Sequence, residues 1–172
     1  MITLARDFDY FSLGKDIDAY YQTGKQKRFR RFKKMTEPIK PKPEAITYLE
    51  SRKITAATAE KYQITAQQNI LMFPFFDQNG DFQNAKYRKT NYNPAVDKNK
   101  EWCESNCKPI LFGMYQCNLD NKTLVLTEGQ IDSLSVAESG IENAVSVPFG
   151  KNGFTWIPYC WEWMQNFDTL IV

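Results

Sequence analysis

Two carboxylates, Glu128 and Asp132, stand four positions apart in the stretch LVLTEGQIDSLSVAESG, where an apolar segment runs into a helix-like one. The chain contains no histidine, which excludes Ser-His and Cys-His nucleophilic catalysis. Any chemistry in this protein must therefore rest on carboxylates, cations and a metal ion.

The cysteines do not form a strong metal motif. Cys103, Cys107 and Cys117 lie in CESNCKPILFGMYQC, whereas structural zinc sites usually combine two tight Cys-x2-4-Cys pairs or include histidine. We therefore expect no zinc site in this segment. We interpret these cysteines, together with Cys160, as the free thiols of a cytoplasmic protein.

The elements around the two acids alternate between strand and helix. The patterns predict strands at 123–127, 143–147 and 168–172, with helices at 129–140 and 156–166 between them. This alternation favours parallel strands joined by right-handed crossovers, as in an open α/β sheet. Ligands of such sheets bind beyond the carboxyl ends of the strands, and Glu128 falls at that edge.

Gly129 permits a tight turn after the strand and leaves room for a ligand to approach. Asp132 falls in the first turn of the following helix, where an acid is often only a capping or dipole feature. That explanation is adequate for Asp132 alone. It accounts less well for Glu128, because the end of a buried strand is an unfavourable place for a charge without a role.

The stretch ILMFPFFDQNGDFQNAKYRKTNY predicts a β-hairpin with DQNG as its turn. The two-residue period of the return strand puts Lys86 and Arg88 on one face and Lys89 on the other. Two cations on one strand face can bind phosphate, and an ordinary solvent face is an equal alternative. Residues 93–109 are predicted to form a long polar loop, followed by a short element at 110–116.

A basic segment, KQKRFRRFKK at 25–34, holds seven of the 22 Lys and Arg residues and no acid. Its cations are Lys25, Lys27, Arg28, Arg30, Arg31, Lys33 and Lys34. Such a segment indicates contact with a polyanion, although a solvated linker is the alternative. Phe29 and Phe32 favour nucleic acid, because aromatic rings stack on bases while cations neutralise phosphates.

The fold class is α/β, with an α+β subdomain followed by a partial parallel sheet flanked by helices. Two short helices are expected at 45–53 and 55–64, with Thr55 capping the second. The Pro-rich stretch EPIKPKPE marks a boundary, and DIDAYYQ before it is helical in character. We divide the chain into a basic extension at 1–37, a hairpin-containing subdomain at 38–121 and the parallel-sheet subdomain at 122–172.

The stretch TEGQIDSLSVAESGIENAVSVPFG resembles the opening of the Toprim domain of DNA primases, topoisomerases and some nucleases. Upstream, FPFFDQNGDFQNAKYRK and the LFG at 111–113 are similar to segments of the primase cores of phage primase-helicases and of the related mitochondrial helicase. The similarity covers roughly residue 45 to the C-terminus. The order of the motifs is more specific than any one of them.

The resemblance implies synthesis of RNA primers on single-stranded DNA from ribonucleoside triphosphates, with Mg²⁺ or Mn²⁺ as cofactor. Glu128 would be the metal ligand or general acid/base, and Asp132 would belong to the same acidic cluster. Lys86 and Arg88, with Lys89 and Gly129, would contact the incoming triphosphate or the template. Phosphoryl transfer depends mainly on positioning and charge neutralisation, so it needs no histidine. A replicative helicase, in cis or in trans, would be the partner.

One departure from the family pattern is important. The family has an Asp-x-Asp motif just after the third strand, whereas this chain ends at DTLIV, and Asp168 precedes that strand. We therefore expect a fragment of a longer primase, with weak metal binding and little primer synthesis from these 172 residues alone.

Two other functions stay open. A Toprim nuclease or topoisomerase fragment would share Glu128 but would not need the basic hairpin. A non-catalytic single-strand-binding or helicase-associated module would rely on the basic segment. The sequence has neither a signal peptide nor an apolar run long enough to span a bilayer, so we expect no membrane contact and a cytoplasmic location in a bacterial or phage-infected cell.

Overall fold

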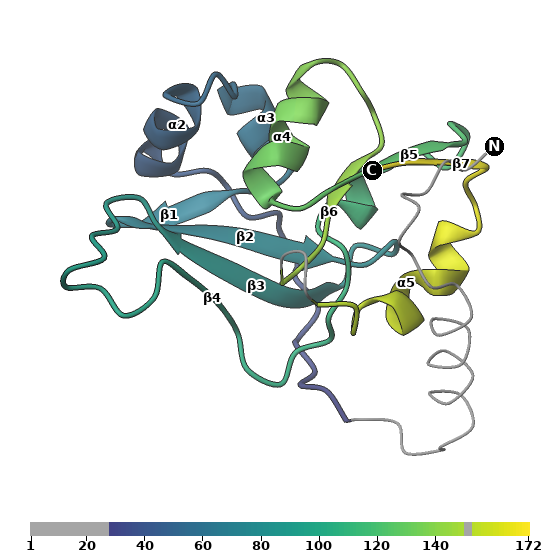
Figure 1. Ribbon diagram of the computed structural model, residues 1–172, viewed down its shortest axis with the longest axis horizontal. Coiled ribbons are helices and arrows are strands. Elements are labelled where there is room, and N and C mark those ends of the chain that lie inside the picture. The colour runs from purple at the N-terminus through teal and green to yellow at the C-terminus, as the bar shows by residue number, and fades with distance from the viewer. Residues whose placement is uncertain (1–27, 150–152) are drawn as a thin grey trace.

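The computed structural model describes residues 28–149 and 153–172, which form two β-sheets with helices packed around them (Figure 1). One sheet is antiparallel, with strand order β1-β2-β3-β4, and the other is parallel, with order β6-β5-β7. The elements are α2 (Pro43–Glu50), α3 (Ala56–Lys61), β1 (Thr65–Gln67), β2 (Ile70–Phe76), β3 (Phe82–Lys89), β4 (Glu101–Cys103), the 3-10 helix η1 (Met114–Gln116), β5 (Thr123–Thr127), α4 (Gln130–Glu138), β6 (Ala144–Ser146), α5 (Ile157–Met164) and β7 (Thr169–Ile171). The helix expected in DIDAYYQ lies outside the described residues.

Helices α2 and α3 confirm the two short helices predicted before the hairpin. Pro43 opens α2, where its missing N–H would have had no partner in the helix anyway. Thr55 caps α3, since its side-chain oxygen accepts a hydrogen bond from the Thr58 N–H at 3.4 Å. The Thr55 N–H also donates to the Glu138 carboxylate at the end of α4, which ties α3 to the parallel-sheet half of the chain.

Strands β2 and β3 form the predicted hairpin. In its turn, the Asp77 carboxylate accepts hydrogen bonds from the backbone N–H groups of Asn79 and Asp81, and Gly80 adopts a φ of 79° that favours glycine. The polar loop predicted at 93–109 is wrong in part, because residues 101–103 form strand β4 against β3. The short element predicted at 110–116 is present as η1.

The parallel sheet confirms the alternation read from the sequence. β5 lies in the centre, pairing in parallel with β6 through Val125 and Ala144 and with β7 through Thr123 and Thr169. None of the helices in the described part of the chain is long and apolar enough to cross a membrane.

Phe112 joins the two sheets. Its backbone exchanges hydrogen bonds with Ser146 of β6, at 2.9 and 3.1 Å, while its ring packs against Phe73 and Phe75 of β2. The next residue, Gly113, has a φ of 91°, and a Cβ there would lie 2.8 Å from the Ala144 carbonyl oxygen. One hydrophobic core therefore runs across both halves of the described chain, and the glycine of the LFG segment is required by this close approach.

Candidate functional site

Glu128 directly follows β5, at the carboxyl edge of the central parallel strand, as the sequence predicted. The Thr127 hydroxyl holds the turn at this edge, with acceptors at the Gly129 carbonyl, 3.1 Å away, and the Val145 carbonyl, 3.2 Å away. Helix α4 then begins at Gln130, which places Asp132 in its first turn. Both carboxylates line one cleft of about 720 Å³.

The structure corrects one argument made for Glu128. The side chain is exposed, so its position involves little loss of hydration, and the unfavourable burial inferred from the sequence does not apply. Among the described residues, Glu128 has no hydrogen-bond or ion-pair partner. An exposed carboxylate without an internal partner at a ligand-binding edge is available to a ligand.

Asp132 folds back over the turn. A Cβ on Gly129 would lie 2.7 Å from the Asp132 Oδ2, closer than real atoms approach, so the carboxylate occupies the space that a side chain at 129 would fill. Gly129 has a φ of −117°, which any residue adopts, so space rather than backbone conformation requires the glycine here. Gly129 was predicted to leave room for a ligand. In the structure, the space beside Gly129 is occupied by the carboxylate of Asp132.

Gln130 was missed by the sequence analysis. Its side chain is buried and its amide donates to the Ser146 hydroxyl at 3.1 Å and to the Val147 carbonyl at 2.9 Å. These bonds fasten the start of α4 to the segment that follows β6. A buried amide next to two exposed acids gives no signal in sequence, because its partners lie 16 and 17 residues away.

The basic hairpin forms the opposite wall of the cleft. Lys86 and Arg88 lie on the same face of β3, as predicted, and both line the cleft. Both are paired with Glu101 of β4, at 2.9 Å from the Lys86 Nζ and 2.5 Å from the Arg88 Nη1. Burial acts to raise the pKa of Glu101, but the hydrogen bonds and charges of the two cations outweigh it and lower that pKa. Lys86, Arg88 and Glu101 therefore form one ionic group of three side chains.

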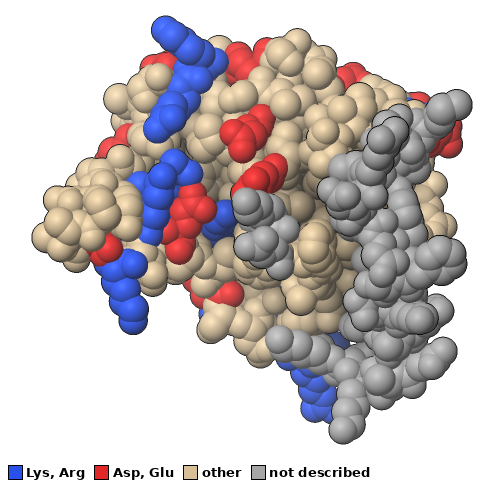
Figure 2. All heavy atoms as spheres, in the orientation of Figure 1, with Lys and Arg blue, Asp and Glu red and all other residues tan. Residues whose placement is uncertain are grey.

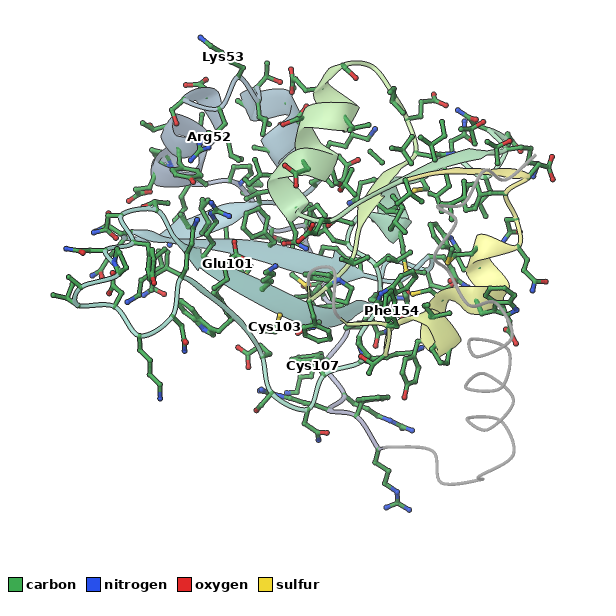
Figure 3. The ribbon with its side chains drawn as sticks, in the orientation of Figure 1. Arg52, Lys53, Glu101, Cys103, Cys107 and Phe154 are labelled. Carbon is green, nitrogen blue, oxygen red and sulfur yellow. The ribbon has the colours of Figure 1, made fainter. Side chains whose placement is uncertain are left out.

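Glu101 and Arg52 are the two charged cleft residues that sequence reasoning missed. Glu101 lies in the segment predicted to be a loop, and a three-residue strand is too short to show a period. Arg52 follows α2, is exposed, and rests over the ring of Tyr48 at 5.4 Å. Figure 3 shows Arg52 above the antiparallel sheet, near α2, and Glu101 lower in the view, over the strands of that sheet.

The charged groups that line the cleft are balanced. Three are cations and three are acids: Arg52, Lys86, Arg88, Glu101, Glu128 and Asp132. Blue and red side chains adjoin on the face shown in Figure 2. Cys103 also lines the cleft, but burial raises the pKa of its thiol to about 11, so it is not a thiolate nucleophile at neutral pH.

The remaining predicted binding residues that the structure describes lie away from the cleft lining. Lys89 lies on the other face of β3 and pairs with Asp97 in the loop before β4. Lys25 and Lys27 of the basic segment lie outside the described residues. Arg28, Arg31, Lys33 and Lys34 are exposed, and Arg30, also exposed, pairs with Glu104 at 3.4 Å.

The two phenylalanines of the basic segment do not serve as free stacking surfaces. Phe29 packs edge-on against Tyr159 of α5, with ring centres 5.1 Å apart, and Phe32 packs against Phe82 of β3 at 4.7 Å. Both rings are part-buried in these contacts, so the structure gives no support to the predicted stacking on bases. Instead they hold residues 28–34, which form neither a helix nor a strand, against the body of the protein.

Glu128 and Asp132 could supply part of the coordination shell of a Mg²⁺ ion. The described residues contain no group of three or more His, Cys, Asp or Glu side chains that could hold a metal ion. Mg²⁺, however, is commonly bound through one or two carboxylates, with waters and substrate phosphates completing the shell. Glu128 and Asp132 are oxygen ligands at one cleft, so they would hold such an ion only with help from a substrate.

Replacing Gly129 with alanine tests this arrangement. The added Cβ would displace the Asp132 carboxylate, a flexible group, so we expect little change in the free energy of unfolding and about a tenfold loss of Mn²⁺ affinity. The measurement is Mn²⁺ binding in the presence of ATP, followed by electron paramagnetic resonance, because the two acids would hold the ion only together with substrate phosphates. Asp132→Asn should show the same loss, and the double variant should lose no more than either alone. Full Mn²⁺ affinity in Gly129→Ala would contradict a role for Asp132.

The fold, an antiparallel hairpin sheet beside a parallel sheet flanked by helices, is similar to that of solved primase catalytic cores. The solved structure of the E. coli primase catalytic core matches with a TM-score of 0.58 and 18% identity, over 75% of this chain and 55% of that one. The primase fragment of the bacteriophage T7 primase-helicase protein matches with a TM-score of 0.58 and 21% identity, over 86% of this chain and 59% of that one. The DnaG primase catalytic domain bound to single-stranded DNA matches with a TM-score of 0.57 and 17% identity, over 93% and 62%.

These likenesses confirm the predicted fold class and the resemblance to primase cores at the level of fold. The chain spans about 55–62% of the length of these three structures. The sequence itself matches no protein-family model and no curated protein. The division at residues 38 and 122 stays a prediction.

Proposed function

We propose that this chain is part of the catalytic core of a DNA primase, which synthesises RNA primers on single-stranded DNA. The observation that carries the proposal is the cleft itself, in which Glu128 after β5 and Asp132 in the first turn of α4 face the cationic side chains of Lys86 and Arg88 on β3. The likeness of fold to primase cores supports it. A primase-helicase context and a cytoplasmic site of action belong to the same proposal.

The residues divide the work by charge. Lys86, Arg88 and the exposed Arg52 would orient and neutralise the triphosphate of an incoming ribonucleotide. Glu128 and Asp132 would hold Mg²⁺ or Mn²⁺, which supplies charge stabilisation for the transferring phosphoryl group. Alternatively, Glu128 would act as the general base that accepts the proton of the attacking hydroxyl group, whose oxygen bonds to the α-phosphorus of the ribonucleotide as pyrophosphate leaves. Residues 28–34 would contact the phosphates of a single strand, since their exposed cations lie on a segment that Phe29 and Phe32 anchor to the protein.

The test is ribonucleotide incorporation on a single-stranded DNA template with Mg²⁺ or Mn²⁺, made with the complete gene product that contains these residues. Glu128→Gln should lower incorporation by at least about 100-fold while leaving single-strand binding unchanged, because the exposed Glu128 contributes little to folding. DNA cleavage in place of synthesis would favour the Toprim nuclease alternative. Single-strand binding without either reaction would favour the non-catalytic module.

A further inference from the structure

Among the described acids that line the cleft, Glu101 is the one that forms ion pairs with cations that also line it. Register places it directly opposite Arg88, since β4 pairs with β3 through Arg88 and Glu101 and through Lys86 and Cys103. One oxygen of the carboxylate accepts from Lys86 at 2.9 Å and the other from Arg88 at 2.5 Å. Lys86 and Arg88 together are called the cationic ledge below. The proposed function assigns this ledge to the binding of phosphate.

Exposure shows which group a ligand meets first. The side chains of Lys86 and Arg88 are 10% and 19% exposed, whereas that of Glu101 is 30% exposed. The cations cannot turn into solvent without leaving their packing in the sheet. The carboxylate is the more accessible member, so an anion that approaches the ledge from the cleft encounters a negative charge.

Carboxylate and phosphate oxygens accept the same hydrogen bonds from lysine and arginine. An anion that binds Lys86 and Arg88 must therefore take the position of the Glu101 carboxylate or share the cations with it. We propose that Glu101 is an internal competitor for polyphosphate: it occupies the ledge in the free protein, and the ligand binds there by displacing it. The inference rests on the proposed function, because it takes the ledge to be the polyphosphate site.

The charges of the cleft give this competition a consequence. With three cations against three acids, the cleft offers no net positive charge to a bare polyphosphate. Loss of the Glu101 charge alone would leave the cleft with a net positive charge and would leave Lys86 and Arg88 without their counter-ion. Polyphosphate binding without a divalent ion is thus restrained by Glu101, and removing its charge should strengthen that binding rather than weaken it.

The experiment measures binding of inorganic tripolyphosphate by calorimetry in the presence of EDTA. Glu101→Gln keeps the size and one acceptor of the side chain and removes its charge, and we expect it to bind tripolyphosphate about tenfold more tightly than the wild type. The matched control is Glu104→Gln, which removes the same charge three residues away. Glu104 pairs with Arg30 and accepts from Tyr87 outside the cleft lining, so its replacement should change the affinity by less than about twofold.

A gain of affinity in Glu101→Gln cannot arise from unfolding, so it would support the inference directly. Equal or weaker binding by this variant would overturn the inference. Glu101 would then have a structural role, which is to keep Lys86 and Arg88 in a position that can bind the ligand. An equal gain in Glu104→Gln would also overturn it, since general charge would then explain the result. Wild-type binding of ATP with Mg²⁺, measured in parallel, reports on the proposed function, so the two can fail separately.

Discussion

Replacing Phe112 with alanine is expected to lower the free energy of unfolding by about 3–5 kcal/mol, the range for truncating a fully buried phenylalanine. The Phe112 ring packs against three aromatic rings, those of Tyr62, Phe73 and Phe75, with centres 5.5–6.0 Å away. No polar group can replace these contacts. Because the Phe112 backbone is also bonded to β6, the cavity would open at the junction of the two sheets.

Urea denaturation followed by circular dichroism measures this effect. The matched control is Phe149→Ala, which removes the same ring from a residue that is 47% exposed, and should change stability by less than about 0.5 kcal/mol. A loss confined to the parallel-sheet half, seen as two separate transitions, would contradict the single core. A loss below about 1 kcal/mol would show that the junction repacks around the cavity.

The sequence predicted the parallel sheet because its signals are local. TLVLT is followed at once by a glycine turn and a helix, and that order leaves few ways to connect the strands. The hairpin was predictable for the same reason, since the DQNG turn joins two strands in direct succession. Glu128, Asp132, Lys86 and Arg88 could therefore be placed at the right edges and faces.

The rest of the site depends on non-local pairing. Strand β4 is only three residues long, and its partner in β3 is separated from it by a loop that carries no regular pattern. Glu101 could not be assigned to the cleft without that register. Arg52 enters the cleft from the end of α2, and no periodicity relates it to residues 128–132.

In the basic segment, the sequence did not reveal the environment of the two aromatic side chains. The five cations of this segment that the structure describes, at 28–34, are exposed, but composition does not tell whether an aromatic side chain faces solvent or the protein. Phe29 and Phe32 contact residues 130 and 50 positions away, so their burial is a tertiary property. In the proposed function, the exposed cations would supply the affinity for nucleic acid, and the two rings would anchor the segment to the protein.

Replacing Lys86 with methionine is expected to lower the affinity for ATP in the presence of Mg²⁺ by about 10- to 100-fold. Methionine retains the apolar stem that packs in the sheet, and a charge-assisted hydrogen bond to phosphate contributes about 1.5–3 kcal/mol. The loss should exceed that of a surface lysine because Lys86 is 8% exposed, and water screens a buried ammonium group only weakly. Fluorescence anisotropy with labelled ATP is the measurement.

Lys89→Met is the matched control for this experiment. It removes the same ammonium group from the opposite face of the same strand, β3. Lys89 pairs with Asp97 and is absent from the cleft lining, so we expect its replacement to change ATP affinity by less than about twofold. Equal losses in the two variants would place the nucleotide on the hairpin generally rather than in the cleft. A loss in Lys89→Met alone would transfer the binding site to the other face of β3, and with it the role that the cleft acids could play.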